Sequence, residues 1–168
     1  MLEFNSLRII AVCLGMAIST MTPAFAGGKN LVAGTWLMVS AKADPDGENR
    51  DLFGSHPNGQ LIFTEGLQFS DVLVNPDVRM FASSDRAMGT EAENKAVVAG
   101  DLALYGTYTV DEQGCFATEH IVASTFPNWT GLNRDISLIT ETVDGDTMVE
   151  RLKDPGGPQI VIMWKRAR

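Results

Sequence analysis

Groups of turn-forming residues recur about every ten residues along most of this chain, and they limit the segments between them to strand length. The group Asp44-Pro45-Asp46-Gly47 comes first, and residues 111–114 and 144–146 are later examples. Proline fixes one turn position, while glycine supplies the positive φ that another position requires. The intervening segments contain many β-branched and aromatic residues. This spacing therefore predicts strands that pair with their neighbours along the chain.

The predicted strands cover residues 34–43, 60–64, 67–74, 102–110, 115–126, 134–142, 147–153 and 159–166, with a short one at 51–54. One short helix is predicted over 90–100, because Thr90 and Glu93 have capping-box spacing and Gly100 can end the helix. Strands in nearest-neighbour order with one short helix favour an all-β fold, an antiparallel up-and-down β-barrel of about eight strands. A two-sheet sandwich is the alternative.

The first 26 residues have the pattern of a secretory signal peptide. Arg8 is basic, residues 9–18 form an apolar run, and Ala24-Phe25-Ala26 is a small-x-small cleavage signal. The apolar run is about half of the roughly 20 residues that a membrane-spanning helix needs. We therefore expect cleavage after Ala26, a mature domain over residues 27–168, and a periplasmic or secreted protein with no membrane insertion.

The composition excludes some partners and some chemistry. The net charge of −8 repels phosphate backbones, so no nucleic acid partner is expected. Cleavage would leave Cys115 as the single cysteine, which rules out an internal disulfide. His56 and His120 lack the paired spacing of a metal site, and no catalytic or phosphate-binding motif occurs, so we predict no metal, no cofactor and no catalytic residue. The oligomeric state is not predicted.

Several ordered segments resemble one family. Gly34-Thr35-Trp36 matches the G-x-W start of lipocalin-type barrels, and Trp164-Lys165-Arg166 lies where such barrels often carry an arginine that packs over the opening tryptophan. The segments FGSHPNGQLIFTEG, TEAENKA, YGTYTVDE, STFPNWTGLNRDI and MWKRA follow the order of bacterial lipocalin-like domain proteins. The resemblance covers nearly all of residues 27–168. It implies a calyx-like barrel that holds an apolar molecule, with Trp36 and Arg166 closing its floor, and it implies no reaction.

Strict alternation along residues 115–126 and 134–141 yields a hypothesis for the inner wall. If Ile136, Leu138 and Thr140 face inward, matching faces place a second set inside. That set is Phe116, Thr118, His120, Val122, Ser124 and Phe126. Glu119 would then face outward, so Glu119 and His120 could not act as a pair. Whether Tyr105 or Tyr108 faces inward depends on the turn at 111–114.

The predicted ligand-binding residues follow from this wall. They are His120, Arg134, Tyr105, Thr118, Ser124 and Trp129. A mostly apolar concavity with a few placed polar groups is typical of small-molecule sites. His120 is alternatively a buried histidine with its hydrogen bonds satisfied, and Trp129 either covers the mouth or folds back over an apolar edge.

Three functions fit this sequence. The first is an exported lipocalin-like protein that binds a small, largely apolar molecule in its barrel. The second is an isomerase or cyclase, in which His120 and a tyrosine transfer protons on an apolar substrate. The third is a structural or interaction module with a filled barrel. The sequence names no reaction and favours a protein that is not an enzyme.

Overall fold

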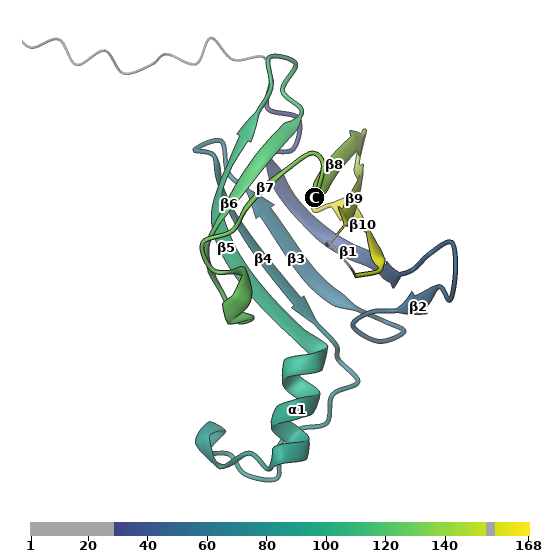
Figure 1. The fold of residues 1–168 in the computed structure, drawn as a ribbon, viewed down its shortest axis with the longest axis vertical. Helices are drawn as coiled ribbons and strands as arrows, with labels where there is room; N and C mark the ends of the chain where they lie inside the picture. Colours follow the sequence, from purple (N-terminus) through teal and green to yellow (C-terminus); the bar gives the residue numbers. More distant parts are fainter. Residues whose placement is uncertain (1–28, 154–156) are drawn as a thin grey trace, which may run out of the picture.

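The computed structural model describes residues 29–153 and 157–168, so the predicted signal peptide at 1–26 lies outside the described residues. The described part forms one antiparallel sheet of ten strands that curls around its core (Figure 1). The strand order is β7-β6-β5-β4-β3-β1-β10-β9-β8, with β2 paired to β1. β7 and β8, at the two ends of this order, contact each other and nearly close the barrel. The prediction of an up-and-down barrel is confirmed, and the sandwich alternative is not.

The strand bounds agree with those predicted for β1, β9 and β10. The strands are β1 (Gly34–Ala43), β2 (Arg50–Asp51), β3 (Asn58–Phe63), β4 (Gln68–Val74), β5 (Asp101–Val110), β6 (Phe116–Ser124), β7 (Asn133–Asp135), β8 (Ile139–Asp144), β9 (Thr147–Lys153) and β10 (Gln159–Arg166). The predicted strand at 134–142 is divided by a turn at 136–138. Two very short strands, β2 and β7, bring the number above the predicted eight.

One face of each long strand contributes side chains to the core of the barrel. Trp36, Tyr108, Ile121, Met148 and Trp164 are its largest fully buried side chains, together with Val32 before β1. Burial alternates along the strands, as in the exposed-buried pattern of β4 and β9. The register between β1 and β10 pairs Trp36 with Arg166 and so joins the first long strand to the last.

Two bulges interrupt the pairing of β5 with β6. Thr109 pairs with Thr118 but Val110 pairs with Phe116, so Ala117 is an extra residue on β6. A second shift lies between Tyr105 and Gly106. Gly106 is required there, because a Cβ at this position would collide with the carbonyl oxygen of His120. Each bulge changes which face of β6 the following residues occupy.

Helix α1 (Glu91–Gly100) projects from the end of the sheet where β5 begins (Figure 1). The predicted capping box is present: Thr90 Oγ1 accepts from the Glu93 amide, and the Glu93 carboxylate accepts from the Thr90 amide. Most residues of the helix are exposed. Within the described ranges, no helix combines the length and apolar character needed to cross a bilayer.

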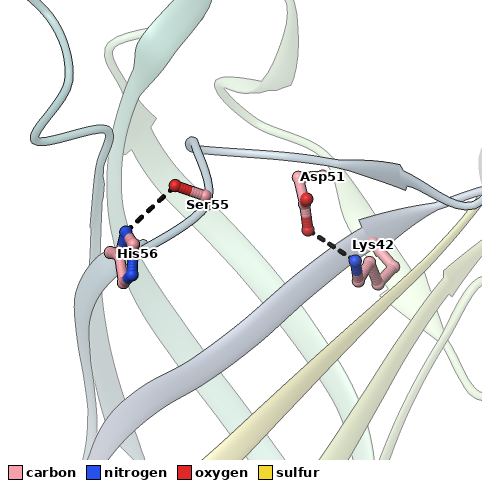
Figure 2. A network of polar contacts seen from close by, with 4 residues as sticks. All are labelled: Lys42, Asp51, Ser55 and His56. Carbon is pink, nitrogen blue, oxygen red and sulfur yellow. Dashed lines mark hydrogen bonds and ion pairs between the residues drawn. The ribbon is translucent and has the colours of Figure 1, made fainter.

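β2 is a short strand that pairs with the last two residues of β1, Lys42 and Ala43. Asp51 pairs with Lys42 in the register of the two strands, and their side chains form an ion pair (Figure 2). His56 lies nearby in an exposed turn, where its Nδ1 is 3.0 Å from Ser55 Oγ (Figure 2). Both interactions lie at the surface, away from the barrel core.

A candidate binding cavity with buried carboxyl groups

A cavity lies inside the barrel. It encloses about 550 Å³ of space free of protein atoms, counting its opening to solvent, and about 60 Å³ of it admits the centres of water molecules. A water needs roughly 10–15 Å³ on this measure, so the cavity has room for a small group of waters. The apolar lining includes Leu61 and Phe63 of β3, Phe69 and Leu73 of β4, Leu104 of β5 and Leu152 of β9.

Five ionisable side chains interrupt this apolar lining. Their exposed fractions are 6% for Asp71 of β4, 5% for Glu119 of β6, 4% for Arg134 of β7, 8% for Glu141 of β8 and 7% for Glu150 of β9. All five line the cavity, and together they are called the carboxyl–arginine cluster. Buried charges are rare in proteins unless they are paired, so this concentration marks the cavity as the candidate site.

The local sequence explains why two of these carboxyl groups face inward. Asp71 lies two residues from both Phe69 and Leu73, and these neighbours belong to the core. Glu150 has the same relation to Met148 and Leu152 on β9. Successive strand residues point to opposite faces, so a residue midway between two buried ones shares their face. Strand alternation therefore positions these acids as firmly as it positions the core.

Glu119 and Arg134 form an ion pair inside the barrel. They are opposite each other in the register of β6 and β7, and Arg134 Nη1 donates to Glu119 Oε1 at 3.1 Å. The guanidinium carbon of Arg134 also lies 4.2 Å from the centre of the Trp129 ring, a cation–π contact. Arg134 Nη2 has no hydrogen-bond partner among the described residues. One donor of this pair is thus free to meet a bound molecule.

Glu141 and Glu150 form a like-charged pair. They are directly opposite each other in the register of β8 and β9, and both side chains are buried. Glu150 Oε2 accepts from the Trp164 indole nitrogen at 3.0 Å. Glu141 Oε2 and Asp71 Oδ1, by contrast, have no partner in the described part of the chain. Two carboxyl oxygens are therefore left without a hydrogen bond in the cavity lining.

Burial governs the protonation of the cluster. It raises the pKa of Asp71 and of Glu141 well above their ordinary values, and repulsion from neighbouring carboxylates adds to this. Burial, assisted by the charge of Glu119, raises the pKa of Glu150 to about 7 against a hydrogen bond from Trp164 that lowers it. Burial also raises the pKa of Glu119, although Arg134 opposes the shift. Burial therefore favours the neutral form of these acids, beside the Glu119–Arg134 ion pair.

The inward assignment of His120 and Thr118 was wrong, and Tyr105, whose orientation the sequence left open, does not face the interior either. All three are exposed, and Tyr108, not Tyr105, is the tyrosine buried in the core. The extra residue at Ala117 is the cause, because it keeps Phe116 inside but reverses the faces that strict alternation assigns to the residues after it. Glu119 and Ile121 consequently face inward, as do Ile139 and Glu141 on β8, whereas Ile136 lies exposed in the turn between β7 and β8.

The predicted residues consequently divide between two places. Arg134 and Trp129 line the cavity. His120 Nδ1 lies 2.9 Å from Asn133 Oδ1, and Thr118 Oγ1 lies 2.7 Å from Thr109 Oγ1, both on the exposed face. Ser124 is half-buried at the end of β6, where its Oγ accepts from the Phe126 amide at 3.0 Å.

Trp36 and Arg166 lie together outside the cavity lining. The guanidinium carbon of Arg166 is 4.0 Å from the centre of the Trp36 ring, and its nitrogens donate to the carbonyl oxygens of Ala33 and Leu31 at 2.7 and 3.1 Å. Gly34, with φ of 140°, makes room for this arrangement, because a Cβ there would collide with Arg166 Nη1. The G-x-W pattern thus has a packing reason in this chain.

The sequence matches the model of a family described as a lipocalin-like domain, over residues 33–167. The chain belongs to the lipocalin-like domain family. Among solved structures it is similar to a de novo designed fluorescence-activating β-barrel, with 13% identity and a TM-score of 0.40 over 82% of this chain and 94% of that chain. No curated protein matches the sequence.

One wall of the cavity in this lipocalin-like barrel is shared with a wider outer groove. The groove offers about 570 Å³ to water molecules and runs beside the end of α1 and the start of β5. Phe53, Leu73, Leu102 and Trp129 line both the cavity and the groove. These four side chains border both spaces and are called the partition.

The carboxyl–arginine cluster has no arrangement typical of a metal centre. Within residues 29–153 and 157–168, no group of three or more His, Cys, Asp or Glu side chains is placed to hold a metal ion. Protonated carboxyl groups can donate hydrogen bonds, ionised ones can accept them, and Arg134 Nη2 can donate. The cluster is thus suited to hold one polar group of a molecule whose remainder is apolar.

Proposed function

We propose that this lipocalin-like protein binds a small, largely apolar molecule inside its barrel, with the polar group of that molecule at the carboxyl–arginine cluster. One observation carries the proposal: buried, unpartnered polar atoms of Asp71, Arg134 and Glu141 line a mostly apolar cavity. An unsatisfied buried polar atom costs about 1–3 kcal/mol, which a bound polar group would recover. Membership of the family accounts for the barrel fold, and these unpartnered polar atoms are the reason to place a ligand inside it.

The size of the cavity limits what can bind. A molecule confined to the cavity would have few atoms, whereas an elongated one could pass the partition at Phe53, Leu102 and Trp129 and leave its tail in the outer groove. Both compartments are bordered by apolar side chains. We therefore expect a ligand with one polar end and a narrow apolar body. A filled barrel that serves only as a structural module would have no use for this hollow.

The N-terminal segment completes the proposal. Residues 1–26 have the pattern of a cleaved signal peptide, so we propose that the binding takes place in the periplasm or outside the cell. Intact mass measurement of the protein purified from its source tests this directly, because cleavage after Ala26 predicts one mass. A chain that retains residues 1–26 in full would contradict export by this route.

Native mass spectrometry of the same preparation tests binding. A protein with a ligand should show a second species, heavier than the mature chain by one small molecule, that disappears under collisional activation. Glu141→Leu should lose this species if the cluster holds the ligand, whereas Thr142→Val, at the exposed neighbour on β8, should keep it. A protein that never carries a ligand, and that takes up no apolar molecule in solution, would contradict the proposal.

The enzyme alternative is favoured by one observation of its own. Glu150 lines the cavity with a pKa of about 7, which is the range where a carboxyl group can both donate and accept a proton at neutral pH. An isomerase or cyclase would use Glu150 in this role, in place of His120, which is exposed. Glu150→Gln separates the two functions: loss of turnover with binding retained indicates the enzyme, and a protein without turnover indicates the carrier.

A further inference from the structure

The carboxyl–arginine cluster has an excess of acidic groups. Among the residues that line the cavity, four carboxyl groups face one guanidinium, and Glu119 takes that guanidinium through its 3.1 Å hydrogen bond. Asp71, Glu141 and Glu150 are left without a cationic partner in the described ranges of the chain. Proteins seldom bury carboxyl groups in this proportion unless something else compensates them.

The free atoms of the cluster are acceptors for the most part. Asp71 Oδ1 and Glu141 Oε2 have no hydrogen-bond partner within the described ranges, and both residues are more than nine-tenths buried in the cavity lining. An ammonium group carries three donors and no acceptor, so it fits two carboxylate oxygens. A carboxylate ligand would find Arg134 Nη2 as a free donor but would meet repulsion from the other three acids.

The surroundings favour a cation with an apolar body. Glu150 lies directly across from Glu141 on the neighbouring strand, so its charge adds to the attraction. Leu61, Phe69 and Leu73 border the same cavity and can contact a hydrocarbon chain. Arg134, which carries the opposing charge, is directed to Glu119 and lies over Trp129.

We propose that the molecule bound in the barrel is an apolar amine whose ammonium group is held between Asp71 and Glu141, with Glu150 beside them. This inference rests on the proposed binding function and specifies its ligand class. The ammonium replaces the protons that these acids hold in the empty barrel. Binding is then coupled to proton release, because burial raises the pKa of these carboxyl groups and so favours their neutral form, whereas a bound cation favours their ionised form.

Calorimetric titration of the purified protein with three probes of equal chain length tests the proposal. The probes are octylamine, octanol and octanoate. We expect octylamine to bind at least about tenfold more tightly than octanol at pH 7, since charge-assisted hydrogen bonds are about twice as strong as neutral ones. Octanoate should bind most weakly. Heats measured in buffers of different ionisation enthalpy should show that octylamine releases protons and octanol does not.

Isosteric variants locate the ammonium. Asp71→Asn and Glu141→Gln should each weaken octylamine by about tenfold or more while leaving octanol within about twofold, because only the charge is removed. Glu112→Gln, a matched change at an exposed turn, should alter neither affinity. Retained octanol binding shows that each variant is folded.

Each result decides something. Octylamine that binds no tighter than octanol would overturn the amine proposal while leaving the binding function intact. The same holds if octylamine binds tightly but its affinity is unchanged in both Asp71→Asn and Glu141→Gln. If none of the three probes binds, the proposed function fails for apolar molecules of this kind, and the amine proposal fails with it.

Discussion

Two cross-strand pairs in this barrel share one geometry and have opposite composition. Glu119 and Arg134 face each other across β6 and β7, and Glu141 and Glu150 face each other across β8 and β9. In the first pair the arginine neutralises the glutamate, so the pair needs no further countercharge. The second pair repels itself when ionised and must hold a proton or a cation. The strands near the gap in the barrel therefore combine a fixed ion pair with a site that responds to its surroundings.

Breaking the Glu119–Arg134 ion pair should have the largest effect on stability. Arg134→Met leaves Glu119 buried without a countercharge, and we expect a loss of about 3–5 kcal/mol in the free energy of unfolding at neutral pH. Urea denaturation measures it, with the exposed Arg151→Met as control. The loss should shrink near pH 4, where Glu119 becomes protonated because its pKa is raised. An equal loss at both pH values would mean that packing over Trp129, not charge, is what Arg134 provides.

The Glu141–Glu150 pair, called the responsive pair, should make the protein less stable as the pH rises. Glu150 has an unfolded pKa near 4.5 and a folded pKa of about 7, so the folded state binds more protons between these values. Its stabilising contribution is full below pH 4.5 and is lost as the pH approaches 7, by about 3 kcal/mol in total. The pKa values of Asp71 and Glu141 are raised as well, so the ionisation of these groups adds to the loss as the pH rises.

Exposed carboxylates set the acid limit of this stability window. The pKa of Glu93 and that of Asp135 are lowered by hydrogen bonds, so their contribution is lost as the pH falls below ordinary carboxyl values. Denaturation measured from pH 4 to pH 8 should therefore show greatest stability on the acid side of neutrality. Glu150→Gln should flatten the slope between pH 5 and pH 7. A stability that rises through this range would contradict the assignment of the buried acids.

Removing one acid of the responsive pair should stabilise the protein moderately. Glu141→Leu replaces a buried carboxyl group that has an unpartnered oxygen by an apolar side chain, and we expect a gain of about 1–3 kcal/mol at pH 7. The same variant should lose amine binding, a trade of function for stability. Thermal unfolding at pH 7 checks the gain, with Thr142→Val at the exposed neighbour on β8 as control. A destabilised Glu141→Leu would show that this carboxyl group has a partner of its own.

The smallest effect concerns the hydrogen bond that holds Glu150. Trp164→Phe removes the indole donor, and this donor lowers the pKa of Glu150. The pKa should rise further, by about one unit for a hydrogen bond to a charged group of about 1.5 kcal/mol. A carboxyl NMR titration of the variant measures the shift directly. An unchanged pKa would assign the value of about 7 to burial and Glu119 alone.

The sequence predicted where strands begin and end better than it predicted which of their side chains face the interior. Turn residues fix where strands end, and the bounds of β1, β9 and β10 followed from them. The inward-facing residues of β6 did not follow from the sequence. Strict alternation fails at a bulge, and nothing in the sequence at Ala117 indicates one. Assigning apolar Ile136 and Leu138 to the inside compounded the error, since they lie in a turn region after β7.

The sequence contains a signal for the buried acids, but a search for apolar residues alone overlooks it. Asp71 lies in phase with Phe69 and Leu73, and Glu150 lies in phase with Met148 and Leu152. A charged residue at such a position is buried by its neighbours whatever its own preference. Arg134 was predicted at the site, but its partner Glu119 was assigned to the opposite face. The convergence of five strands on one cluster depends on barrel closure, which no local pattern reveals.

The extra residue at Ala117 also bears on how such a barrel can change over generations. Losing that one codon would leave a single residue between Phe116 and Glu119, which is the spacing that plain alternation requires for two inward side chains. The cavity wall would therefore survive the deletion, whereas a deletion in an unbulged strand would turn every later side chain to the opposite face. The bulge thus gives this point of β6 a tolerance to loss of one residue that is usually associated with loops.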